Sequence, residues 1–153
     1  MATQPQRPDS EASHYQGLAI YRAATLVFVC CDKVVKHFSR HHTYMLGNEL
    51  RQHAMRAPVL VMRANRRAQR VAALDELCLC AETMKILVNL GKEVEAFVSF
   101  AAYVELTKLV VDLAKQAEAW RRYSVQARPV SGPHLATANS VKDSGPANSE
   151  GPE

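Results

Sequence analysis

Four arginines and no acidic residue lie in the stretch RANRRAQR, residues 63–70. Arginine presents its N–H donors in a planar fork that matches the oxygens of phosphate and carboxylate groups. From residue 36 to 70 the chain has eight basic residues and one acid, Glu49. Solvated helix faces usually alternate in sign, and this run does not. It therefore favours a polyanionic partner, with a simple solvated face as the alternative.

Histidines and cysteines are the other residues that could bind a metal. His37, His41 and His42 include one i, i+4 pair, but no acid stands close enough in the sequence to complete a site. The four cysteines, at positions 30, 31, 78 and 80, are one or two residues apart within each pair and form no CxxC motif. Such neighbours point to different sides of a helix. We expect buried, reduced thiols, no metal and no cofactor.

No combination of residues predicts catalysis. The sequence has no glycine-rich phosphate loop, and no Ser-His-Asp or Cys-His set can be singled out. The spacing of Arg51 and His53 does not fit the Arg-x4–6-His motif of helical ribonucleases of the HEPN type. Glu49 and His53 miss the Glu-x-x-His spacing of di-iron bundles by one residue. We expect that the chain is not an enzyme, and a helical nuclease is the alternative to be tested.

Composition divides the 153 residues into a core and two tails. Residues 1–15 and 124–153 are polar and lack periodicity, which predicts disorder, whereas residues 16–123 should form one folded domain. The tails hold three basic and five acidic residues, so the core has 16 basic and 10 acidic residues and a net charge of +6. No apolar run approaches the ~18 residues of a membrane span, and the first residues do not resemble a signal peptide. We expect a cytoplasmic protein.

Apolar residues at three- and four-residue spacing predict four helices, over about 17–38, 43–69, 72–95 and 98–123. No strand pattern is present, and the connections are short, which favours an antiparallel up-down-up-down four-helix bundle. Pro58 should kink the second helix, and Ser99 should cap the fourth. The first helix is apolar over roughly twice the arc that a bundle needs, so we expect it to bury a second face against another subunit.

On the second helix the arginines would form one stripe. At about 100° per residue, Arg56, Arg63, Arg67 and Arg70 fall within about 60° of one another, with Arg66 beside them. These five are the candidate nucleic-acid or protein contacts, supplying charge and register without base readout. Asn65 is better explained by a hydrogen bond at a helix end, and Trp120 by a place in the core.

The core resembles a known family. HHTYMLGNELRQHAMRAPVLVMRANRRAQRVAALDELCLCAETMKILVNLGKE (residues 41–93) and FVSFAAYVELTKLVVDLAKQAEAWRR (residues 97–122) look like the accessory variability determinant (Avd) proteins of diversity-generating retroelements. The marks are Leu46-Gly47, Ala64-Asn65, the leucine-rich third helix, the Ser99, Tyr103 and Leu106 spacing, and Trp120. The resemblance covers about residues 18–122. The wider family of four-helix bundles includes small proteins encoded in intervening sequences of 23S rRNA genes.

This resemblance implies a homopentameric barrel of four-helix bundles without catalytic activity. Such proteins bind the element's reverse transcriptase and nucleic acid. With the template-repeat RNA, that complex makes cDNA with substitutions at template adenines, and the cDNA replaces a variable region of a target gene by mutagenic retrohoming. The partners expected here are therefore the reverse transcriptase, template RNA or cDNA, and copies of the chain itself. The alternative is an orphan bundle that serves as a protein-interaction module, without a reverse transcriptase.

Overall fold

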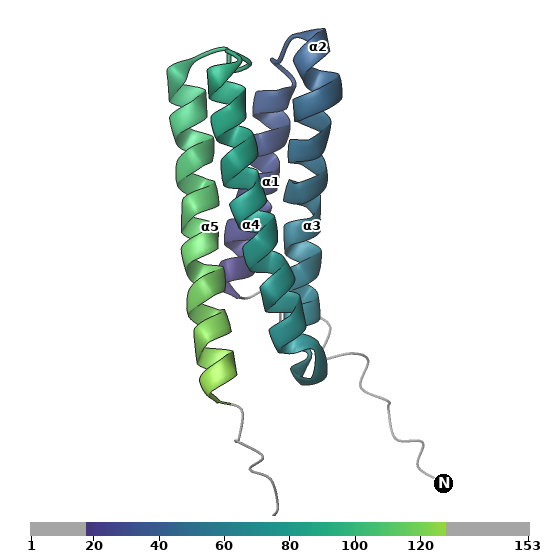
Figure 1. The fold of residues 1–153 in the computed structure, drawn as a ribbon, viewed down its shortest axis with the longest axis vertical. Helices are drawn as coiled ribbons and strands as arrows, with labels where there is room; N and C mark the ends of the chain where they lie inside the picture. Colours follow the sequence, from purple (N-terminus) through teal and green to yellow (C-terminus); the bar gives the residue numbers. More distant parts are fainter. Residues whose placement is uncertain (1–17, 128–153) are drawn as a thin grey trace, which may run out of the picture.

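The computed structural model describes residues 18–127, and this part of the protein is all-helical. Four long helices run side by side as a bundle: α1 (Ala19–Val35), α3 (Asn48–Asn65), α4 (Arg70–Glu93) and α5 (Phe100–Gln126) (Figure 1). None of the helices in this range is both long and apolar enough to cross a lipid bilayer. The predicted tails, residues 1–15 and most of 124–153, lie outside the described residues.

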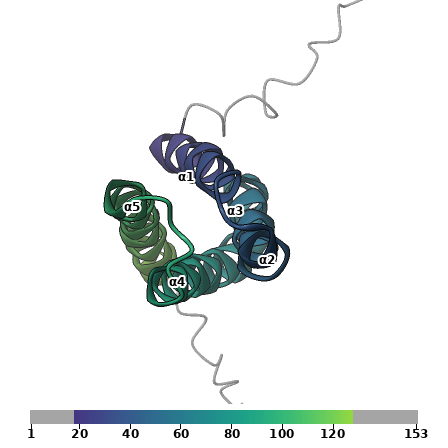
Figure 2. The same ribbon diagram turned by 90° about the horizontal axis from the view of Figure 1, so that it is seen from above.

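The four helices surround one core. Seen from the end, they follow one another around the bundle in the order α1, α3, α4, α5, and α5 lies next to α1 (Figure 2). All four contribute large side chains that are fully buried, among them Val27, Leu60, Leu74, Met84 and Leu113. Burying one such side chain stabilises the fold by about 1.5–3 kcal/mol. The shared core therefore fixes the positions from which the polar side chains reach the surface.

The predicted helices exist, but their ends differ from the prediction. The first was expected over 17–38 and ends at Val35; the second was expected over 43–69 and ends at Asn65. The third begins at Arg70 rather than 72, and the fourth continues to Gln126 rather than 123. Ala68 and Val94 fall within the expected helices, but both are exposed because they lie beyond the ends of α3 and α4. α3 continues through Pro58 to Asn65.

Two serines act as helix caps. The Oγ of Ser99 accepts a hydrogen bond from the backbone N–H of Ala102 at the start of α5, as predicted. The Oγ of Ser39 does the same for His42 in the short helix α2 (Arg40–His42). A π turn, η2 (Thr43–Gly47), joins α2 to α3. The Oγ1 of Thr43 donates to the carbonyls of Phe38 and Ser39, which ties this turn to the chain leaving α1.

Aromatic rings close the end of the bundle at which α4 connects to α5. The ring of Phe97 makes edge contacts with Phe38 and Tyr103, with centroids 5.3 and 5.6 Å apart. The backbone N–H of Ala96 donates to the carbonyl of Gly91, 2.8 Å away, and Glu95 between them has φ 55°. This pairing is typical of a helix that ends in a left-handed residue.

Gly47 is needed for space rather than for its backbone freedom. Its φ of −64° is helical, yet a Cβ at this position would lie 2.5 Å from Cγ1 of Val35. Gly47 is buried where η2 crosses the end of α1. The close approach of these two segments therefore depends on the missing side chain.

We expect Gly47→Ala to lower the free energy of unfolding by about 1–3 kcal/mol, measured by urea denaturation, because the added methyl group overpacks the contact with Val35. In a Val35→Ala background the same change should cost nothing or stabilise, since alanine favours the helix by roughly 1 kcal/mol over glycine. Equal costs in the two backgrounds would show that Gly47 serves another purpose.

Candidate polyanion-binding surface

The arginine stretch lies where α3 ends and α4 begins. The chain leaves α3 at Arg66, whose backbone is extended (φ −81°, ψ 119°), and makes one 3-10 turn, η3 (Arg67–Gln69), before α4 starts at Arg70. The predicted stripe of Arg56, Arg63, Arg67 and Arg70, with Arg66 beside it, is therefore wrong. The 100° step applies only within one helix, and Arg66, Arg67 and Arg70 lie beyond the end of α3.

The side chain of Arg70 is hydrogen-bonded to the end of α3. Its Nε donates to the carbonyl of Ala64 at 3.0 Å and its Nη2 donates to the carbonyl of Asn65 at 3.2 Å. Its guanidinium also lies over the ring of Trp120 on α5, 5.8 Å from the centroid. The last carbonyls of a helix lack intrahelical partners, so Arg70 satisfies the end of α3. Asn65 is the last residue of that helix, and the atom that accepts from Arg70 is its backbone carbonyl oxygen rather than an atom of its side chain.

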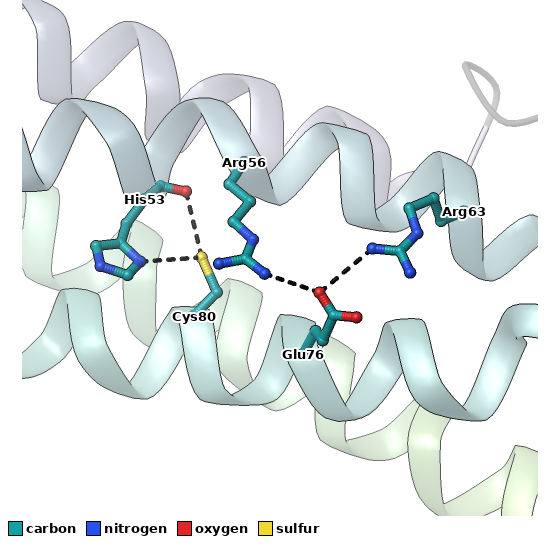
Figure 3. A network of polar contacts seen from close by, with 5 residues as sticks. All are labelled: His53, Arg56, Arg63, Glu76 and Cys80. Carbon is teal, nitrogen blue, oxygen red and sulfur yellow. Dashed lines mark hydrogen bonds and ion pairs between the residues drawn. The ribbon is translucent and has the colours of Figure 1, made fainter.

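Arg56 and Arg63 share one acidic partner. The Nη2 of Arg56 lies 2.8 Å and the Nη1 of Arg63 lies 3.3 Å from Oε2 of Glu76 on α4 (Figure 3). The hydrogen bond from Arg56, followed by that from Arg63, lowers the pKa of the Glu76 carboxyl, which therefore remains ionised. The two arginines keep a net charge of +1 with Glu76. Sequence reasoning missed this acid because it considered α3 without the helix that packs beside it.

Arg66 and Arg67 are the free arginines of the set. Both are exposed, and neither side chain has a hydrogen bond or ion pair with another residue of the described range 18–127. They stand one after the other on the turn between two helices, so their guanidinium groups are open to a partner. The five predicted residues thus fall into three groups. Two arginines pair with Glu76, the side chains of Arg66 and Arg67 are free, and Arg70 bonds to the end of α3.

A hollow opens beside this turn. Its volume is about 570 Å³, and it is lined by residues of η3, the first turns of α4 and the end of α5: Arg67, Ala68, Arg70, Val71, Ala72, Asp75, Tyr123, Ser124 and Ala127. This hollow was not predictable from the sequence, because the end of α5 lies some fifty residues along the chain from the arginines. Only the packing of α4 against α5 brings Ser124 to this place.

The cysteines are free thiols that are wholly or partly buried. Cys30, Cys31 and Cys80 are buried and Cys78 is half-buried, and all four are free. Burial raises the pKa of Cys31 to about 12 and those of Cys78 and Cys80 to about 11. The Sγ of Cys80 donates to the carbonyl of His53 at 3.2 Å and lies 3.7 Å from the Nδ1 of that residue (Figure 3). The predicted buried, reduced state is confirmed for three of the four.

In residues 18–127, no three His, Cys, Asp or Glu side chains lie close enough together to hold a metal ion. No protein-family model, no curated protein and no solved structure matches the chain.

We expect Arg70→Met to lower the free energy of unfolding by about 1.5–3 kcal/mol, the range for hydrogen bonds to a charged group, because two carbonyls of α3 lose their donor. The matched control is Arg66→Met, which removes the same charge from an exposed side chain without partners and should change stability by no more than about 0.5 kcal/mol. Urea denaturation compares them. Equal effects would mean that Arg70 does not hold the end of α3.

We also expect the native protein to resist alkylation by iodoacetamide at pH 8, with all four cysteines modified only after unfolding in guanidinium. Three pH units below a pKa of about 11, roughly one thiol in a thousand is ionised. Mass spectrometry of samples quenched over an hour measures the modification. Rapid labelling of native Cys78 or Cys80 would contradict the raised pKa values.

Proposed function

We propose that this protein is a non-catalytic accessory protein of a diversity-generating retroelement, which binds the reverse transcriptase together with template RNA or cDNA in the cytoplasm. The observation that carries the proposal is the free pair Arg66 and Arg67, exposed on the α3–α4 turn without an acidic partner in residues 18–127. Arginines that are already positioned but unpaired suit phosphate oxygens. The resemblance of residues 18–122 to Avd proteins supplies the biological context.

The overall charge supports a polyanionic partner. Residues 18–127 contain 16 basic and 10 acidic side chains, a difference of +6. Eight of the basic and six of the acidic side chains form the ion pairs within this range. Eight basic and four acidic side chains then remain outside ion pairs. The unpaired charge is therefore mostly positive, which attracts nucleic acid over a distance.

We further propose that the bundle is antiparallel and that five copies form a barrel. His53 meets Cys80 and Arg63 meets Glu76, so the residue numbers of α3 rise while those of α4 fall. The contacts of Asp75 with Arg121 and of Asn89 with Tyr103 give the same opposite order for α4 and α5.

An exposed apolar face on α1 supports the assembly of several copies. Leu26 and Val29 are exposed and offer the second apolar face that an assembly would cover. Five described cores at +6 each would carry about +30.

The cysteine–histidine contact supports a non-catalytic role. A nucleophilic cysteine needs a lowered pKa, usually beside a base or a positive charge. The thiol of Cys80 instead has its pKa raised to about 11 by burial, and it donates to the carbonyl of His53. The arrangement keeps the proton on sulfur, which is the opposite of what nucleophilic attack requires.

A protein-interaction module without a reverse transcriptase is the second candidate. Leu79, Ile86 and Leu90 are exposed at spacings of seven and four residues, which places them on one face of α4. An exposed apolar row of this kind is typical of a surface that binds another protein. This candidate predicts binding that does not depend on RNA and a smaller assembly.

The test is RNA binding by the full chain over a range of salt concentrations. Each phosphate contact to a single strand contributes about −0.7 to the slope of log affinity against log salt. We expect Arg66→Glu combined with Arg67→Glu to weaken binding and to flatten this slope by roughly 1.4, the contribution of two contacts.

The matched control is Lys108→Glu with Lys115→Glu. These two exposed lysines of α5 form no ion pair within residues 18–127, and the double change alters the net charge by the same amount. It should leave most of the slope intact. Equal losses in the two double variants would place the effect in the net charge rather than at the α3–α4 turn, and a flat wild-type curve would refute RNA binding.

A further inference from the structure

The hollow at the end of the bundle has the size and lining of a ligand site. Its volume of about 570 Å³ lies within the range of roughly 300–1,000 Å³ usual for small-molecule pockets. It lies between the start of α4 and the end of α5, beside the free arginines. Charged groups, a hydroxyl and a helix N-terminus converge on one place there.

Arg67 and Arg70 provide two positive charges in the hollow. Arg67 has no partner in the described part of the chain. Arg70 is held by two carbonyls and by the ring of Trp120. A guanidinium carries five N–H donors, and these two hydrogen bonds occupy two of them. Arg70 is therefore already oriented while three donors remain for a ligand.

Ser124 is the unexplained group of this region. Its residue is 8% exposed, and its Oγ is the one buried side-chain oxygen or nitrogen without a hydrogen-bond partner in residues 18–127. The helical threonines Thr25, Thr83 and Thr107 each donate to the carbonyl four residues earlier, at 2.7–2.9 Å. Ser124 lines the hollow and does not make that bond. A buried hydroxyl left unpaired calls for a partner that a ligand can supply.

The start of α4 adds favourable polarity. Gln69 precedes the helix and makes no side-chain cap, although α4 is 24 residues long. The backbone N–H of Arg70 already donates to the carbonyl of Arg67, but the N–H groups that follow it lie at the end where the helix dipole favours an anion. Asp75 is the one acid of the lining, and its carboxylate pairs with Arg121. The hollow is therefore positive despite this acid.

We propose that this pocket binds a phosphate monoester, held by Arg67, Arg70, Ser124 and the start of α4. A monoester carries a charge of about −1.5 to −2 at pH 7 and three acceptor oxygens, which match two guanidinium groups and a hydroxyl. The group belongs to the end of a nucleic-acid strand or to a free nucleotide. This proposal rests on the proposed function, because the pocket would be one contact between the protein and its nucleic-acid partner. The experiment below distinguishes failure of the pocket from failure of the function.

The experiment uses the full chain and three probes: a short RNA with a 5′ phosphate, the same RNA with a 5′ hydroxyl, and adenosine monophosphate. Calorimetry should show roughly tenfold tighter binding of the phosphorylated RNA, as expected for one additional charged hydrogen-bonding group. Ser124→Ala and Arg67→Gln should remove this preference. Saturable binding of adenosine monophosphate would identify a free nucleotide as the source of the group, and its absence beside a clear 5′ preference would identify the strand end.

Ser124→Ala should keep or raise the thermal midpoint, because the hydroxyl has no partner within the described fold to lose. Thr25→Ala is the control, since it removes a helical hydroxyl that is already bonded on α1, and it should leave the 5′ preference unchanged. If the wild type binds RNA without a 5′ preference, or if the preference survives Ser124→Ala, the pocket is overturned. Salt-dependent RNA binding would then leave the proposed function standing. Binding of adenosine monophosphate that Ser124→Ala abolishes, without binding of either RNA, would instead retain the pocket and refute the function.

Discussion

Arg70 of α4 contacts both α3 and α5, and one end of the molecule depends on this junction of three helices. Arg70 is the first residue of α4, its guanidinium closes the last carbonyls of α3, and it lies over Trp120 of α5. The apolar core would hold these helices together without it. The hydrogen bonds of Arg70 to Ala64 and Asn65 span the turn that carries Arg66 and Arg67 and so tie the two ends of that turn together.

The helices were predictable because each carries an apolar stripe that any partner helix would bury. Leu106, Val110, Leu113 and Ala117 on α5 show this most clearly. The end of α3 was not predictable in the same way. No glycine or proline marks it, and the helical pattern continues formally through Ala68. Its last carbonyls accept hydrogen bonds from a side chain five or six residues later, and the periodicity of apolar residues gives no sign of such a contact.

The sequence predicted which segment of the candidate surface is basic, but not how its arginines are arranged or which residues lie beside them. Counting charges located the basic segment, and four of the five arginines lie on or beside the α3–α4 turn, whereas Arg56 lies near the middle of α3. Their separate surroundings depend on Glu76, which reaches Arg56 and Arg63 from the neighbouring helix, and on Ser124, which belongs to the end of α5. Residues that become neighbours only through helix packing leave no local pattern in a single sequence.

The π turn at Thr43–Gly47 also determines how the chain tolerates changes in length. Such a turn holds one residue more than an α-helical turn, and one residue corresponds to about 100° of rotation about the axis. It therefore behaves as a one-residue insertion, and the rotation of side chains about the helix axis that this residue causes is confined to the segment before α3. Arg40–His42 take up that rotation, while α3 keeps its register against α1 and α4. An insertion within α3 would instead turn its apolar residues out of the core.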